Sequence, residues 1–358
     1  MNVADTRIFV VCGSGGVGKT TVSASLALRL AEERKRVTVL AVDPAKRLAT
    51  ALGLPKTKGE RATVRVDGTT LEAQVLDTKR TFDELIETHA GDPERAKRIL
   101  DNRFYKRIAD TLSGTHEYMA MERLYELATT EDWDAIVIDT PPTRSALSFL
   151  EAPKRMTDFL GGQMLRWLLW PYRKGGRMGL RGVSLGAQAF SKTIGRIAGA
   201  ELLSDLGQFL AAFEGMYDGF KQRAEEVLRL MHDAGTGFVV VTAPEGRSLE
   251  EAVHFVDRLA EARMHMLGVI VNRWRTAPSV DVPPDVAARL AEGGHAERAL
   301  AACLDVGERL RAVEARERAA TEPFGPSSPE VPLTVVPQLP LDIHDVTGLV
   351  EVGRHLLP

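Results

Sequence analysis

The chain has 358 residues, of which 44% are hydrophobic, so it can bury a sizeable core in one large domain or two closely joined ones. Its 46 Lys and Arg residues nearly balance its 49 Asp and Glu residues, so no global field would attract nucleic acid. Cys12 and Cys303 are the two cysteines, and this number excludes a disulfide framework or a four-cysteine zinc site within one chain.

The first residues lack the basic segment and long apolar segment of a secretory signal. No run in the sequence approaches the roughly 18 apolar residues of a membrane-spanning helix. We therefore expect a cytoplasmic protein. Cys12 ends the first predicted strand, and we interpret it as a packed thiol rather than a reactive one.

A complete P-loop follows the first predicted strand. The strand covers residues 7–11, residues 13–20 read Gly-Ser-Gly-Gly-Val-Gly-Lys-Thr, and an amphipathic helix is predicted over 20–34. This context directs backbone N–H groups and a helix N-terminus at one point, where a phosphate would bind. Lys19 is expected to reach the β- and γ-phosphates, and the Thr20 hydroxyl is expected to bind Mg²⁺.

The rest of the chain alternates short β-rich runs with helical segments, which predicts an α/β fold of the P-loop NTPase kind, with a mostly parallel twisted sheet flanked by helices. The predicted elements are a strand over 37–41, a hairpin over 63–76 that turns at Asp67-Gly68, helices over 80–126 broken at Gly114, strands over 134–139, 238–241 and 267–271, a helix over 283–319, a Pro/Ser-rich linker over 321–332, a strand over 333–336 and a helix from about 342.

One long helical segment interrupts this alternation. Residues 154–234 are mostly helical in pattern, and we predict that they form an inserted helical subdomain. The P-loop domain would then consist of residues 1–153 and 235–358.

Two carboxylates are predicted at the carboxyl ends of strands, the edge where ligands bind in open α/β folds. Asp139 ends the apolar run 136–138 in the manner of a Walker B strand, and is expected to hold Mg²⁺ through water. Asp43 follows the strand over 37–41, and is expected to orient or deprotonate the attacking water and to contribute more weakly to the Mg²⁺ shell. Its alternative role is to cap a helix that starts near Arg47.

Three segments together resemble the nucleotide motifs of the ArsA family of ATPases, and the resemblance runs from residue 7 to the last residue. They are the P-loop over 13–21, the Asp-Pro-Ala of residues 43–45, and residues 139–143, which read Asp-Thr-Pro-Pro-Thr. Residues 114–122 are most similar to a bacterial branch described as anion-transporting ATPases. The resemblance implies ATP hydrolysis with Mg²⁺ by a dimer whose nucleotide state controls the binding and release of a protein or transport partner.

The resemblance also implies how the base is bound. By it, Asn272 reads the adenine edge, and Pro337 and Gln338 lie in the loop that packs against the ring. No Asn-Lys-x-Asp or Thr-Lys-x-Asp element of the kind that reads guanine is present, which also favours adenine. The predicted nucleotide-binding residues are Gly15, Gly16, Val17, Gly18, Lys19, Thr20, Thr21, Asn272, Pro337 and Gln338.

The chain departs from the family pattern at the P-loop. The family usually has a lysine at the position of Ser14, and that lysine reaches the phosphates of the dimer partner. Two alternatives stay open: a homodimer in which Lys46, Arg47 or Arg144 supplies the cation within the chain, and a heterodimer with a related subunit that keeps the lysine. The cysteines that bind arsenite or an interfacial zinc in the family are missing, so we expect no zinc and no iron–sulfur cluster.

The helical subdomain does not identify its partner. Residues 159–170 are rich in aromatic and aliphatic side chains, and residues 173–181 contain four basic ones. This pattern fits a subdomain core with a solvated basic loop, a helix that binds a hydrophobic client, or a segment that contacts the inner face of the membrane. For the whole protein, the alternatives to an ATPase switch are a low-turnover nucleotide-binding scaffold or partitioning factor and a cluster-bearing reductase of the same fold.

Overall fold

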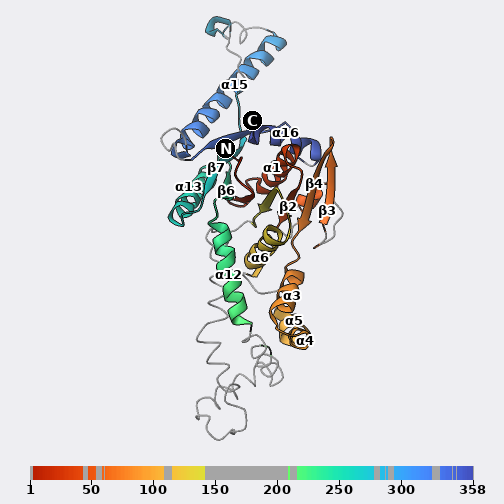
Figure 1. Cartoon of the computed structure of the whole chain (residues 1–358). Helices are drawn as coiled ribbons and strands as arrows, with labels where there is room; N and C mark the ends of the chain where they lie inside the picture. Colours follow the sequence, from red (N-terminus) through yellow and green to blue (C-terminus); the bar gives the residue numbers. More distant parts are fainter. Residues whose placement is uncertain are drawn as a thin grey trace, which may run out of the picture.

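An eight-stranded sheet lies at the centre of the computed structural model (Figure 1). The structure describes residues 3–42, 47–53, 59, 61–108, 115–141, 209, 216–277, 283–286, 288, 294–324, 331–340, 342–343 and 345–357. The strands are β1 (Ile8–Cys12), β2 (Val37–Ala41), β3 (Arg61–Val66), β4 (Thr69–Val75), β5 (Ala135–Asp139), β6 (Thr236–Thr242), β7 (Met266–Trp274) and β8 (Leu333–Pro337). Their spatial order is β3-β4-β2-β5-β1-β6-β7-β8, and each neighbouring pair is parallel except β3 with β4.

The central strands are buried on both faces, which explains their nearly continuous apolar sequences. Every residue of β1, β2 and β5 is buried. Along β1, Ile8, Val10 and Cys12 contribute to the core on one side of the sheet, and Phe9 and Val11 contribute to the core on the other.

Helices cover both faces of this sheet. The helices on the side of Phe9 are α1 (Lys19–Glu33), α2 (Arg47–Ala51) and α16 (Val346–Leu356), and Figure 1 shows α1 and α16 side by side. The helices that contribute to the core on the side of Ile8 are α3 (Thr78–His89), α4 (Pro93–Asp101), α5 (Arg103–Ile108), α6 (Thr115–Thr130), α12 (Tyr217–Met231) and α13 (Gly246–Glu261).

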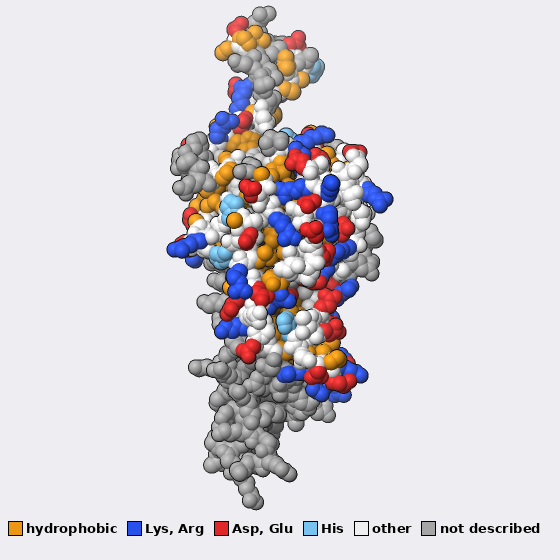
Figure 2. Space-filling view, in the orientation of Figure 1, with side chains coloured by type: hydrophobic (Ala, Val, Ile, Leu, Met, Phe, Trp, Pro, Cys, Tyr) orange, Lys and Arg blue, Asp and Glu red, His pale blue; other side chains and the backbone are white. Residues whose placement is uncertain are grey.

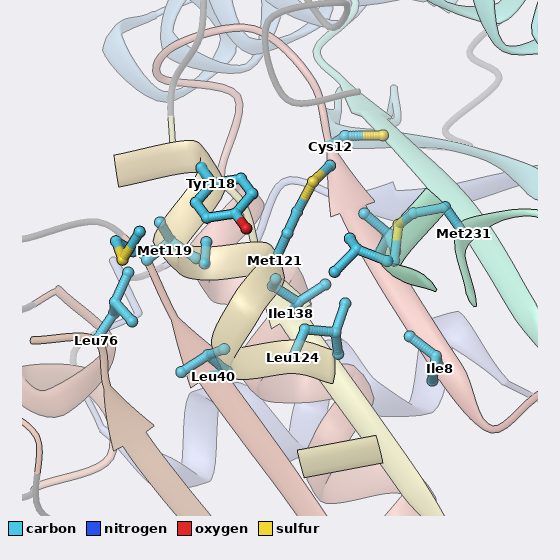
Figure 3. Packing of buried hydrophobic residues seen from close by; sticks show 14 of the residues in the cluster. Ile8, Cys12, Leu40, Leu76, Tyr118, Met119, Met121, Leu124, Ile138 and Met231 are labelled. Atoms are coloured by element: carbon cyan, nitrogen blue, oxygen red, sulfur yellow. The ribbon is translucent and has the colours of Figure 1, made fainter. Parts of the chain in front are cut away.

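Helix α6 is the centre of the second layer (Figure 3). Tyr118, Met121 and Leu124 are fully buried and lie over the sheet among Cys12 and Ile138. Burial of a side chain of this size stabilises the folded state by roughly 1.5–3 kcal/mol, because its apolar surface is removed from water. The layer therefore fixes α6 against the strands that end at the P-loop and at Asp139.

A buried ion pair joins α6 to α12. Glu122 on α6 has a side chain that is 8% exposed, and its Oε1 lies 3.0 Å from Nε of Arg223 on α12. Arg223 also pairs with Glu226 at 3.2 Å and stacks over the ring of Tyr125 at 4.4 Å. Burial raises the pKa of the Glu122 carboxyl to about 7, although the positive charge of Arg223 acts in the opposite direction.

Most described elements agree with the sequence predictions, but the helical stretch predicted over 80–126 is divided into α3, α4, α5 and α6, and the break predicted at Gly114 lies outside the described residues. The hairpin turns at Asp67 and Gly68, which both have positive φ angles of 47° and 85°. The predicted linker over 321–332 differs, because residues 322–324 form a short 3-10 helix, η1 (Glu322–Phe324), and Phe324 is buried in the core. Helix α12 lies within the range predicted for the helical subdomain, and its buried side chains join the layer around α6.

One long helix extends away from the sheet. Helix α15 (His295–Ala320) accounts for most of the helix predicted over 283–319, residues 284–286 and 288 before it are also helical, and most of the described residues of α15 are exposed (Figure 1). Among the described helices, none is both long and apolar enough to cross a membrane. Figure 2 shows acidic and basic side chains intermixed over the visible face of the sheet domain.

Candidate functional site

The P-loop connects β1 to α1 in a conformation that depends on glycine. Gly18 precedes α1 with φ 92° and ψ 25°, a left-handed conformation that glycine adopts without steric cost. A Cβ atom on Gly13 would lie 2.1 Å from the carbonyl oxygen of Val241, so the start of the loop lies directly against β6. The start of the loop is thus packed against β6, and the loop leads into the N-terminus of α1 at the carboxyl edge of the sheet.

Lys19 lies over this loop. Its Nζ donates hydrogen bonds to the carbonyl oxygens of Gly13 and Ser14, each at 2.8 Å, and the residue is only 6% exposed. An ammonium group held at this place would meet phosphate oxygens bound by the backbone N–H groups of the loop. The Ser14 hydroxyl is buried and has no hydrogen-bond partner among the residues that the structure describes.

Asp139 and Thr20 lie together beside the loop. Strand β5 pairs with β1 so that Asp139 is opposite Val11, and the Asp139 residue is 1% exposed. The Thr20 hydroxyl donates to Asp139 Oδ2 at 2.7 Å. Carboxylate and hydroxyl oxygens are ligands that Mg²⁺ prefers, so this pair fits a Mg²⁺ site next to bound phosphates.

Ser23 is a member of the site that the sequence predictions missed. Its hydroxyl donates to Asp139 Oδ1 at 3.2 Å, and the residue is fully buried. Ser23 follows Thr20 by three residues, so both hydroxyls lie on the same face of α1. This spacing could have identified Ser23 from the sequence, because a serine on the buried face of the P-loop helix needs a polar partner.

Asn272 also reaches the P-loop. Its Nδ2 donates to the carbonyl oxygen of Val17 at 2.9 Å, and its Oδ1 accepts a hydrogen bond from the N–H of Arg273 at 3.0 Å. Pro337 lies opposite Trp274 where β8 pairs with β7, and the N–H of Gln338 donates to the Trp274 carbonyl oxygen at 2.8 Å. Asn272 is thus beside the P-loop. Pro337 ends β8 and Gln338 follows it, and both lie beside the end of the neighbouring strand β7.

Several predicted residues lie outside the described part of the chain. They are Asp43, Lys46, Arg144 and the segment over 159–186. Arg47 begins α2, which agrees with the predicted helix start.

The two cysteines differ in their surroundings. Cys12 is buried, its thiol donates to the Val239 carbonyl oxygen at 3.4 Å, and burial raises the pKa of this thiol far above its ordinary value. Cys12 is therefore the packed thiol that the sequence predicted. A reductase that binds a cluster at a subunit interface would need accessible cysteines, so the buried Cys12 does not fit that alternative. Cys303 is exposed on α15. Within the described ranges, His, Cys, Asp and Glu side chains form no group of three or more that could hold a metal ion.

A P-loop after the central strand of a mostly parallel sheet, with a buried carboxylate at the end of the adjacent strand, defines a P-loop NTPase. Comparison with known proteins places the chain more narrowly. The ArsA ATPase family model, described as anion-transporting ATPase, matches residues 6–289. The chain belongs to this family and is an ATPase.

Curated relatives agree with this assignment. The ATPase ARSA2 of Chlamydomonas reinhardtii is 31% identical over 280 residues, which cover 76% of this chain and 70% of the relative. The ATPase GET3 of Malassezia globosa is 30% identical over 284 residues, covering 77% of this chain and 76% of the relative. The ATPase get3 of Aspergillus terreus is 28% identical over 278 residues, covering 76% and 74%.

Proposed function

We propose that the chain couples Mg²⁺-dependent ATP hydrolysis to a switch between two conformations of a dimer, which bind and release a protein or transport partner. The observation that supports this best is the bond between Thr20 and Asp139, because it joins the helix of the P-loop to the strand that would report the nucleotide state. Any change in the ligands of Mg²⁺ would act on both elements at once.

The described residues fit the metal. Thr20 would bind Mg²⁺ directly and Asp139 would hold it through water, and Asp43, which lies outside the described residues, would contribute more weakly to its shell. When bound, Mg²⁺ would neutralise charge on the phosphates. Ser23 would keep Asp139 oriented, since it donates to the second carboxylate oxygen.

The other proposed roles follow from the charges and the hydrogen-bonding groups of the side chains. Lys19 would stabilise negative charge on the β- and γ-phosphates, and Asp43 would accept a proton from the attacking water. Asn272 would read adenine, with Pro337 and Gln338 against the ring.

A low-turnover nucleotide-binding scaffold is the second candidate, and Ser14 supports it. A serine carries no charge, so a homodimer of this chain lacks a lysine delivered from this position to the partner's phosphates. The second subunit of the dimer would otherwise be a related chain that keeps the lysine.

A hydrophobic client or the membrane face would contact the segment over 159–186. We place the protein in the cytoplasm.

Phosphate release measured with ATP, with and without Mg²⁺, tests this proposal. We expect release with Mg²⁺ to continue over many turnovers and to stop when EDTA is added. Binding of ATP without release of phosphate under either condition would favour the scaffold.

A further inference from the structure

The end of strand β7 is distorted next to the P-loop. The pairing of β7 with β8 shifts register between Val271 and Trp274, and Arg273 within this bulge has a φ angle of 61°. A residue other than glycine in the left-handed region costs about 1 kcal/mol or more, so the surroundings must hold it there. Bulges of this kind redirect a side chain beside a functional site.

The side chain redirected here is that of Asn272. Its amide is oriented from both ends, because Oδ1 must face the N–H of Arg273 and Nδ2 must face the carbonyl oxygen of Val17. Asn272 is only 7% exposed, and its bond to Val17 is buried, whereas its bond to Arg273 is partly buried. Loss of the bond to Val17 would leave a buried carbonyl oxygen without this partner, at a cost of roughly 1–3 kcal/mol.

The contact point on the P-loop is the turn that leads into α1. Val17 and Gly18 precede Lys19, and a Cβ atom on Gly18 would lie 2.3 Å from Nδ2 of Asn272. The absence of a side chain at Gly18 therefore makes room for the amide. Asn272 supports the loop where the backbone turns its N–H groups toward the phosphate site.

We propose that Asn272 is a positioning residue for phosphate binding: from the β7 bulge it holds the turn at Val17 and Gly18 in the shape that receives the phosphates. This role rests on the proposed ATPase function, and it does not require that a base be bound. An amide nitrogen carries two protons, and the bond to Val17 uses one of them. The same side chain would therefore connect the base and the phosphate loop.

Inorganic tripolyphosphate separates the two roles, since it carries phosphates and no base. Its binding with Mg²⁺ is measured by calorimetry beside that of ATP, for the wild type, Asn272→Ala and Asn272→Leu. Leucine fills nearly the same volume, so a cavity would not explain a shared effect. We expect both variants to bind tripolyphosphate about 10-fold more weakly, which corresponds to the loss of one buried hydrogen bond. Gln222→Ala, on the exposed face of α12, serves as the control and should bind like the wild type.

A measurement without ligand completes the test. Hydrogen exchange should be faster at the amides of residues 17–20 in both Asn272 variants, while the melting temperature falls by only a few degrees, as the loss of one buried hydrogen bond predicts. Tripolyphosphate affinity and exchange equal to the wild type, with weakened ATP binding, would overturn the inference and leave Asn272 with the base alone. An equal loss of exchange protection throughout the domain would also overturn it. If the wild type binds neither ATP nor tripolyphosphate, the proposed function itself fails.

Discussion

At the scale of single residues, Lys19 places a positive charge at the phosphate-binding loop. Its Nζ is held by two backbone carbonyl oxygens of the same loop, so its position is fixed before any phosphate arrives. We predict that Lys19→Ala reduces ATP affinity by about 100-fold or more, because the variant loses the charge-assisted bonds to the β- and γ-phosphates. Calorimetric titration with ATP measures this. Lys35→Ala, at the exposed residue that follows α1 closely, is the matched control, and near-normal affinity in Lys19→Ala would contradict the P-loop assignment.

Asp43 gives a second prediction at this scale. Asp43→Asn should leave ATP binding nearly unchanged and lower the rate of phosphate release by roughly 10²-fold or more, because an amide does not accept the proton of the attacking water. The rate is measured at saturating ATP and Mg²⁺, with Asp257→Asn on the exposed side of α13 as the control. An unchanged rate would assign Asp43 to the helix cap at α2 instead.

At the scale of elements, the contact of α6 with α12 contains a group that titrates near neutral pH. The pKa of Glu122 is about 7 in the folded protein against 4.5 for an ordinary glutamate. The folded state therefore binds the proton more tightly, and this contribution to stability is complete below pH 4.5 and is lost as the pH rises through 7. The difference amounts to roughly 3 kcal/mol, and its origin is burial of the carboxylate in the α6–α12 layer.

We predict that Glu122→Gln removes this pH dependence. Between pH 5 and pH 8 the melting temperature of the wild type should fall by a few degrees relative to that of the variant. The groups around Glu122 are Arg223, Tyr118, Glu126 and Glu226, and the nearby His89 on α3 has a pKa lowered chiefly by burial. Comparison with Glu225→Gln, on the exposed face of α12, isolates Glu122. Parallel melting curves for all three proteins across the range would show that the carboxyl is not buried in solution.

At the scale of the whole molecule, the number of complete sites in the proposed dimer depends on Ser14. The hydroxymethyl group is buried in the loop and is too short to reach another subunit. We predict that Ser14→Lys raises the steady-state ATPase rate of the purified chain by about 10-fold or more, because a cation supplied across the interface stabilises the transferring phosphoryl group. Ser14→Ala should not accelerate it. Brisk turnover by the wild type that Ser14→Lys does not increase would indicate a cation within the chain, such as Arg144.

The sequence was most informative where local signals suffice. The P-loop string, the Asp-Gly turn of the β3–β4 hairpin and the apolar run before Asp139 each specify their own backbone, and the structure confirms them. Ser23 and the bulge at Arg273 were not predicted, because their conformations depend on partners far away in the sequence. The bond from Ser23 spans 116 residues and the bond from Asn272 spans 255. The ion pair of Arg223 on α12 with Glu122 on α6 likewise joins residues far apart in the sequence.

The packing of α16 on α1 has a consequence for synthesis of the protein. The P-loop and α1 are translated before β6, which pairs with β1 and begins at Thr236, and before α16, which begins at Val346. Until both have been translated, α1 exposes the apolar face that later meets Leu349, Val352 and Leu356. A nascent chain thus carries the complete phosphate-binding string without the support that shapes it. An intermediate that does not yet bind ATP gains no stability from it, and the exposed apolar face of α1 makes that intermediate prone to aggregation.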